Sequence, residues 1–206
     1  MPTLTASELK AQDPKRFQKE YLKWTEYAID YDWWDYMQDR LKENTAIDGV
    51  RVERIEFRLS YSQGDYATFT GSIDVAMWME ANKYGEQTYA EQFPALYLAA
   101  QDYGDDVKVT TWRQSNARVN YDGQLVGNTY PSGIFSALDQ DAWDELIEEQ
   151  YDMAGLEQAL QDYVDNISAE LYTDLRDEYE HLTSEESFIE SCECNDITFE
   201  IEECEA

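Results

Sequence analysis

The sequence predicts an α+β fold in which N-terminal helices precede an antiparallel β-sheet of about four to five strands, followed by long acidic C-terminal helices and a closing strand. Apolar residues recur at the helical spacing of three or four before residue 45 and after residue 139. Between residues 50 and 121 they instead alternate with polar residues, as strands do. Residues 197–202 alternate again, and we expect this closing strand to join the same sheet.

Length and composition fit one domain. The chain has 206 residues, of which 43% are hydrophobic, enough to bury a substantial core. It contains no internal repeat and no linker rich in Pro, Gly or Ser. We therefore expect a single domain over residues 1–206, with helices and sheet in 1–135 and an acidic helical part with the final strand in 136–206.

The N-terminal region carries helix start signals. Asp13 and Pro14 are typical of the N-cap and first position of a helix, and Thr5 or Ser7 can cap a shorter turn upstream. The apolar residues that follow form two successive helical faces, Phe17, Tyr21, Trp24 and Ala28, and then Trp33, Trp34, Met37 and Leu41. This pattern predicts two helices or one bent helix.

A hairpin is expected next. Asp48-Gly49 is a turn signal, and the alternation after it slips near Arg54, which indicates a β-bulge. Residues 62–65 form a second turn, and the alternation continues over residues 66–78.

The remaining chain alternates between helices and strands. Residues 79–103 predict mixed helix and loop, and residues 107–113 and 117–121 predict two more strands. Asp139 opens a long helical region, in which Gly155 is expected to break or kink the chain.

The distribution of charge is the most unusual feature. The formal net charge is −30, from 45 acidic and 15 basic residues. Residues 1–118 hold 20 acidic and 14 basic residues, whereas residues 119–206 hold 25 acidic residues and one basic residue, Arg176. A halophilic or merely solubilising surface would spread its acid evenly. The asymmetry instead favours a surface that meets a basic partner.

The acidic helices forgo the usual alternation of Glu and Lys, in which opposite charges one turn apart each contribute about 0.2–0.5 kcal/mol. Fifteen carboxylates lie between Asp139 and Glu180. Over a straight helix of about 63 Å this is about one charge per 4 Å, close to the phosphate every ~3.4 Å of a DNA strand. The expected contact residues, acting as phosphate surrogates, are Asp144, Glu148, Asp152, Asp162, Asp165, Asp174, Asp177 and Glu178.

These features predict an inhibitor that occupies the basic site of a nucleic-acid-binding enzyme and does not itself bind nucleic acid. Two alternatives stay open. One is an antitoxin-like or regulatory protein that masks a basic partner without copying DNA, and the other is an enzyme with a carboxylate-bound metal. The pattern also allows a homodimer.

The sequence has few residues that could form a catalytic or cofactor motif. His181 is the only histidine, and we interpret it as a surface residue at a helix end. Cys192, Cys194 and Cys204 are interpreted as free thiols in a polar tail rather than zinc ligands. We expect no enzymatic activity, no cofactor and no dedicated metal site.

The aromatic cluster before residue 37 is interpreted as core or partner packing rather than a platform for bases, because few cations accompany it. No stretch has the roughly 20 apolar residues that a membrane span needs. Contact with an anionic membrane surface is unfavourable. A reducing cytoplasm suits the cysteines.

Part of the chain resembles an uncharacterised family of small acidic proteins from tailed bacteriophages. The resemblance is carried by Thr5–Lys10, Asp13–Phe17, Tyr31–Asp35 and the hairpin Phe57–Phe69 with its Ser62-Gln63-Gly64-Asp65 turn, where Tyr66 replaces a second glycine. It covers about the first 80 residues and transfers no catalytic residue. It implies a phage origin and work in the cytoplasm of an infected bacterium. By analogy of charge alone, phage DNA-mimic anti-restriction proteins are similar, and the expected targets are restriction, CRISPR or recombination nucleases.

Overall fold

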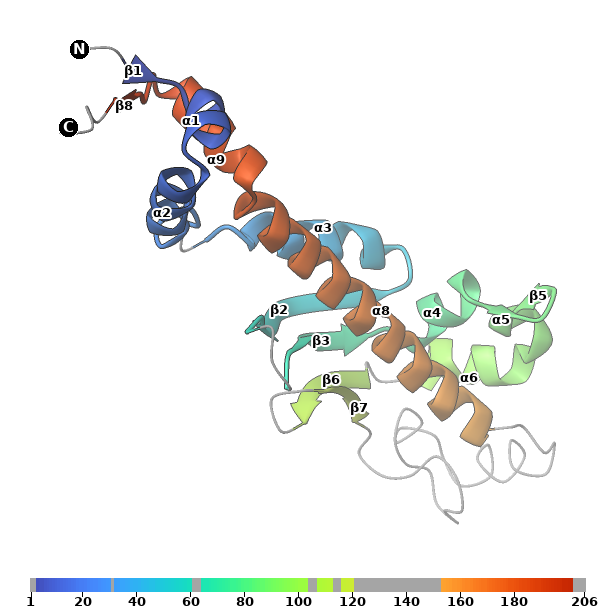
Figure 1. Cartoon of the computed structure of the whole chain (residues 1–206). Helices are drawn as coiled ribbons and strands as arrows, with labels where there is room; N and C mark the ends of the chain where they lie inside the picture. Colours follow the sequence, from blue (N-terminus) through green and yellow to red (C-terminus); the bar gives the residue numbers. More distant parts are fainter. Residues whose placement is uncertain are drawn as a thin grey trace. The chain divides into compact units, whose positions relative to one another are not determined.

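The computed structural model describes residues 3–30, 32–60, 64–103, 107–112, 116–120 and 153–201. It confirms the α+β fold, with N-terminal helices, antiparallel strands, a long C-terminal helix and a final strand (Figure 1). The chain divides into two compact units. The terminal unit consists of Met1–Trp34 and Leu175–Ala206, and the central unit of Asp35–Asp174. Helix α8 (Met153–Leu182) contributes residues to both units.

The terminal unit is built from both ends of the sequence. Helices α1 (Ala6–Gln12), α2 (Pro14–Thr25) and α9 (Glu185–Cys194) enclose its core. The buried side chains of that core are Ala6, Leu9, Phe17, Phe188 and Cys192. Helix α9 replaces the expected polar tail, because Phe188 and Cys192 lie one turn apart and are both buried, and Cys192 is therefore a core residue.

The first two helices begin where the sequence predicts. Thr5 caps α1 in a reciprocal capping box, in which Thr5 Oγ1 accepts from the Glu8 amide and Glu8 Oε2 accepts from the Thr5 amide. Asp13 Oδ1 accepts from the Arg16 amide at 3.1 Å and caps α2, with Pro14 in its first turn. The chain then forms a separate helix, α3 (Asp35–Ala46), so the alternative of two helices is correct.

The closing strand is present, but its expected pairing is wrong. Strand β8 (Phe199–Glu200) pairs antiparallel with β1 (Thr3–Leu4), with Leu4 opposite Phe199, and does not join the main sheet. Both side chains pack against the core of the terminal unit. Burial of these two apolar residues therefore explains the pairing of the chain ends.

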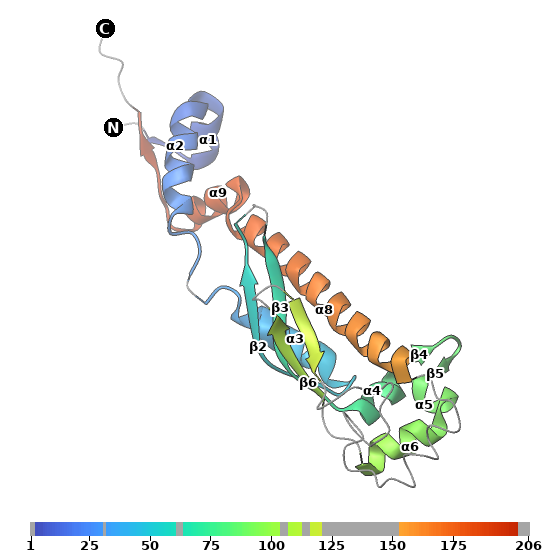
Figure 2. The ribbon, with the colours of Figure 1, turned by 90° about the horizontal axis from the view of Figure 1, so that it is seen from below.

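The central unit contains a four-stranded antiparallel sheet in the order β2-β3-β6-β7. Its strands are β2 (Val50–Arg58), β3 (Tyr66–Ile73), β6 (Val107–Trp112) and β7 (Asn116–Asn120). The register of β2 against β3 shifts between Val52 and Arg54, which confirms the predicted bulge. The part of α8 that belongs to the central unit, residues 153–174, runs along this sheet in both ribbon views (Figures 1 and 2).

Strand β3 ends earlier than the alternation predicts. The expected strand over residues 66–78 stops at Ile73, because Asp74 Oδ1 accepts from the Met77 amide at 3.0 Å and caps helix α4 (Val75–Ala81). Two short strands, β4 (Lys83–Tyr84) and β5 (Gln87–Thr88), then form a hairpin at Gly85. Helices α5 (Tyr89–Gln92) and α6 (Pro94–Tyr103) complete this region.

The buried row of α8 follows the predicted spacing. Its members are Leu156, Leu160, Val164, Ile167, Leu171 and Leu175. Gly155 lies inside the first turn of α8, so the helix continues through the position where a break was expected. The start of the predicted acidic region, residues 139–152, lies outside the described residues.

Gly71 provides a test of the β2–β3 packing. A Cβ at this position would lie 2.0 Å from the Arg51 carbonyl oxygen, so Gly71→Ala must push the two backbones apart next to the bulge. We expect the free energy of unfolding in urea to fall by more than about 3 kcal/mol. The control is Gly85→Ala, where open space surrounds the added Cβ and only the φ of +67° is unfavourable, at about 1–2 kcal/mol. Equal losses in the two variants would contradict the close approach.

Candidate protein-binding surface on helix α8

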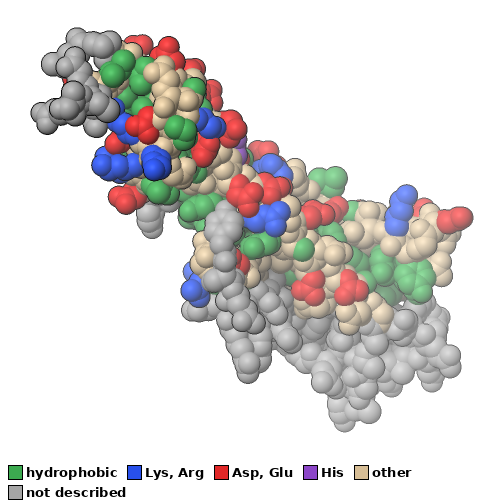
Figure 3. Space-filling model, in the orientation of Figure 1, with side chains coloured by type: hydrophobic (Ala, Val, Ile, Leu, Met, Phe, Trp, Pro, Cys, Tyr) green, Lys and Arg blue, Asp and Glu red, His purple; other side chains and the backbone are tan. Residues whose placement is uncertain are grey.

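The outer face of α8 in the central unit is acidic. The buried row occupies one side of the helix, and helical spacing places Asp162 and Asp165 on the opposite side. Both residues and Glu170 are exposed. Figure 3 shows carboxylates over α8 on the visible face. We call Asp162, Asp165 and Glu170 the α8 carboxylate face.

Neutral donors hold the two aspartates of this face. Gln158 Nε2 donates to Asp162 Oδ1 at 2.7 Å, and Gln161 Nε2 donates to Asp165 Oδ1 at 2.9 Å. These i,i+4 contacts restrict the carboxylates without compensating their charge. Among the residues that the structure describes, no Lys or Arg forms an ion pair with either aspartate. Both carboxylates are exposed to solvent.

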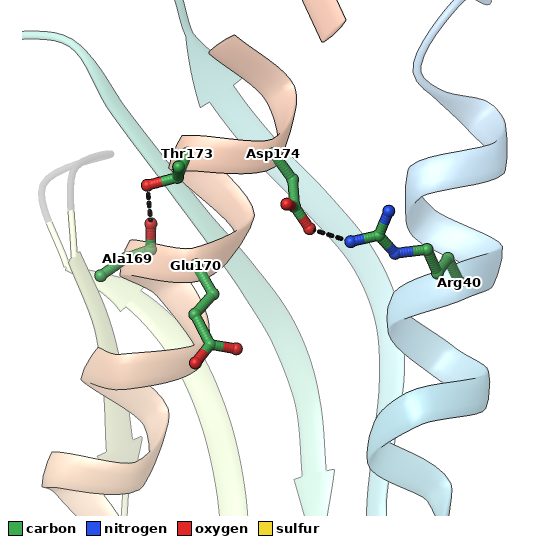
Figure 4. A pocket seen from close by; sticks show the side chains of 5 residues that line it. All are labelled: Arg40, Ala169, Glu170, Thr173 and Asp174. Atoms are coloured by element: carbon green, nitrogen blue, oxygen red, sulfur yellow. Dashed lines mark hydrogen bonds and ion pairs between the residues drawn. The ribbon is translucent and has the colours of Figure 1, made fainter. Parts of the chain in front are cut away.

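A shallow groove of about 380 Å³ borders the carboxylate face (Figure 4). Arg40 of α3 reaches toward α8 and forms an ion pair with Asp174. Thr173 Oγ1 donates to the Ala169 carbonyl at 3.0 Å, so the hydroxyl is used within the helix. Glu170 also lines the groove and has no ion-pair partner in the described part of the chain. Charge along the helix is thus neutralised at Asp174 and uncompensated at Glu170.

The predicted contact residues fall in three parts of the chain: the central unit, the terminal unit and the residues that are not described. Asp162 and Asp165 are exposed and have no ion-pair partner within the described ranges, whereas Asp174 pairs with Arg40. In the terminal unit, Asp177 accepts from Arg176 at 3.1 Å, and Glu178 is half-buried. Residues Asp144, Glu148 and Asp152 lie outside the described residues.

Glu170 belongs to the exposed face but was not among the expected contacts. Its position eight residues after Asp162, outside the buried row, is the signal that identifies it.

Other candidate groups take no part in this surface. His181 is exposed in the last turn of α8, as predicted. Burial is the main cause that raises the pKa of the Cys192 thiol. Among the described residues, no three His, Cys, Asp or Glu side chains are grouped closely enough to hold a metal ion. Of the aromatic cluster, Trp24 packs on Phe188 with ring centroids 5.4 Å apart, whereas Tyr27 is 70% exposed.

The fold and surface define an α+β protein with an exposed carboxylate face on a long amphipathic helix. Residues 33–185 match the family described as a domain of unknown function (DUF8835), and the chain belongs to that family. The matched range contains the whole central unit and α8. Neither the curated proteins nor the solved structures include a match. No helix in the described ranges combines the length and apolar character needed to cross a membrane.

Tyr163 holds the inner side of α8 in the central unit. Its hydroxyl donates to Asp48 Oδ2 in the turn between α3 and β2, and its ring lies edge-on to Trp78, with centroids 5.9 Å apart. Burial is the main cause that raises the pKa of Tyr163, and the hydrogen bond to Asp48 raises it further. The neutral hydroxyl is therefore the form that stabilises the packing of α8.

Substitution of Tyr163 by Phe should lower the free energy of unfolding at neutral pH by about 1–3 kcal/mol, because Asp48 loses its donor. The raised pKa of Tyr163 also predicts how wild-type stability changes with pH. Above the unfolded value of about 10 the unfolded tyrosine releases its proton while the folded one keeps it, so wild-type stability falls by up to about 1.4 kcal/mol per pH unit.

Urea unfolding at pH 7, 9 and 11 tests this expectation. The stability difference between wild type and Tyr163→Phe should be constant up to about pH 9 and shrink by pH 11. The control Tyr27→Phe, at an exposed position, should keep the wild-type pH profile. A difference between wild type and Tyr163→Phe that stays constant to pH 11 would show that the hydroxyl is not held in its neutral form.

Proposed function

We propose that this protein is an inhibitor that covers the basic nucleic-acid site of another protein, with the α8 carboxylate face in place of phosphates. The uncompensated, oriented charges of Asp162 and Asp165 carry the proposal. The resemblance to acidic phage proteins extends it to a phage-encoded inhibitor in an infected bacterial cytoplasm. Its target is a host defence enzyme of the restriction, CRISPR or recombination nuclease class.

The charge density of the face supports this function. Asp162 and Glu170 are eight residues apart, so three carboxylates lie along about 12 Å of helix. One DNA strand carries a phosphate every ~3.4 Å of its axis, so this face has at least half that density. Close charge pairs across protein interfaces contribute about 1.5–7 kcal/mol when measured by double-mutant cycles. Contacts of this strength at the three carboxylates favour one complementary basic surface over others.

A second function is favoured by the arginines of the chain itself. Arg40 neutralises Asp174, and Arg176 contacts Asp177, so the negative charge along α8 is interrupted. An interrupted pattern suits one particular basic surface better than it suits any site that binds a uniform phosphate row. The alternative is therefore an antitoxin-like or regulatory protein that masks a basic partner away from its nucleic-acid site.

Displacement of DNA tests the proposed inhibition. The probe is a fluorescently labelled duplex bound to purified restriction, RNA-guided or recombination nucleases, and its anisotropy is followed as the protein is added. We expect wild type to release the duplex from at least one class. The variant Asp162→Lys/Asp165→Lys/Glu170→Lys should need at least about a hundredfold higher concentration, which corresponds to about 2.7 kcal/mol of lost contacts.

A matched control separates a specific face from net charge. Glu43→Lys/Glu53→Lys/Glu86→Lys changes the charge of the central unit by the same amount at exposed positions on other elements. This variant should inhibit within a few-fold of wild type. Equal losses in both variants, or full inhibition by the α8 variant, would reject the carboxylate face. Binding to a nuclease without release of the duplex would support masking rather than mimicry.

A further inference from the structure

The exposed side of α2 is basic, against the charge of the whole chain. Lys15, Lys19 and Lys23 follow one another at i, i+4 and i+8 and are all exposed. Phe17 lies on the buried side of the same helix, in the core of the terminal unit. Figure 3 shows Lys and Arg side chains gathered over α2. We call Lys15, Lys19 and Lys23 the α2 lysine face.

Two of these lysines have no counter-ion within the described residues. In the same unit, Lys10 pairs with Glu185 at 2.7 Å, and Lys23 pairs with Glu20 at 2.9 Å. Lys15 and Lys19 form no ion pair among the described residues, although the chain has three carboxylates for every basic residue. Two like charges one turn apart destabilise a helix slightly, by about 0.2–0.5 kcal/mol. Packing inside the terminal unit therefore does not explain their placement.

Apolar side chains accompany the lysines. Leu22, one turn after Lys19, is 55% exposed, and Tyr27 just beyond the helix is 70% exposed. Aromatic residues are enriched at protein interfaces, where exposed apolar groups supply contact area and complementary charges supply orientation.

We propose that the α2 lysine face is a self-association surface and that the α8 carboxylate face of a second copy occupies it. The two faces match in sign and in length. Lys23 lies eight residues after Lys15, and Glu170 lies eight residues after Asp162, so each face presents charges over about 12 Å. The proposal shares the α8 face with the proposed function but does not depend on any target.

Net charge sets a distinctive salt dependence for this contact. Two chains of net charge −30 repel each other over long distances, whereas the paired faces attract only at close range. The Debye length is about 30 Å at 0.01 M salt, about 8 Å at 0.15 M and about 3 Å at 1 M. At 0.01 M salt, repulsion between the whole chains dominates. At 1 M salt, the contact between the two faces is itself screened. Self-association is therefore strongest at intermediate salt.

Sedimentation velocity with light scattering, over a dilution series at these three salt concentrations, measures the association. The full chain has a mass of 24.1 kDa, and we expect a larger average mass at about 0.15 M than at either extreme. Lys15→Glu/Lys19→Glu should return the mass to that of the monomer. The control Arg58→Glu/Lys83→Glu makes the same charge change at exposed positions of the central unit and should associate like wild type.

A charge swap tests the pairing itself. Asp162→Lys/Asp165→Lys should also be monomeric, and the chain with all four substitutions should associate again, because the two faces exchange their signs. Circular dichroism checks that each variant is folded. A wild-type monomer at every salt concentration, association that survives Lys15→Glu/Lys19→Glu, or failure of the four-fold variant to recover would each overturn the proposal.

The same variants separate this inference from the proposed inhibition. Lys15→Glu/Lys19→Glu should displace DNA from a nuclease at least as well as wild type, since its α8 face is intact and uncovered. If wild type and this variant are both monomeric, self-association is rejected and the proposed inhibition is unaffected. Binding of wild type, but not of the lysine variant, to a labelled oligonucleotide or to anionic phosphatidylserine vesicles would assign the α2 face to those anions and reject a second copy.

Discussion

The structure depends on burial of the apolar row of α8 against the sheet of the central unit. Leu160 and Val164 are fully buried there, with Leu156, Ile167 and Leu171 nearly so. Burying one such side chain contributes about 1.5–3 kcal/mol, so five contribute roughly 8–15 kcal/mol. A like-charge pair one turn apart costs only about 0.2–0.5 kcal/mol. The inner face therefore stabilises the helix far more than repulsion on the outer face destabilises it, and the carboxylates can stay uncompensated.

Features that depend on local spacing could be predicted from the sequence. The caps at Thr5 and Asp13, the bulge near Arg54 and the apolar row of α8 all depend on residues within a few positions of one another. The end of β3 was missed because the apolar run after Asp74 satisfies both a strand and a helix, and only the cap at Asp74 decides between them.

Features that join distant segments could not be predicted in the same way. No periodicity relates Leu4 to Phe199, yet these residues sit opposite each other in the β1–β8 pair. The same limit applies to the site. Exposure of Asp162 and Asp165 follows from helical spacing, but the neutralisation of Asp174 depends on Arg40, which is 134 residues away. Sequence spacing therefore identifies an acidic face without showing which of its charges the protein already uses.

The excess of acidic residues explains why carboxylates lack ion-pair partners, but it does not explain why lysines do. With three carboxylates for every basic residue, most carboxylates must remain without a cation, and Asp162 or Glu170 needs no special cause on that count alone. For lysines the same excess predicts the opposite. Carboxylates are abundant, so each lysine is expected to find a nearby partner, as Lys10 and Lys23 do. Within the described residues, Lys15 and Lys19 form no ion pair, and the same holds for Arg58, Lys83 and Lys108. Lack of a partner is therefore not what distinguishes α2; the distinguishing feature is that its lysines recur one turn apart on one exposed side, next to the exposed Leu22.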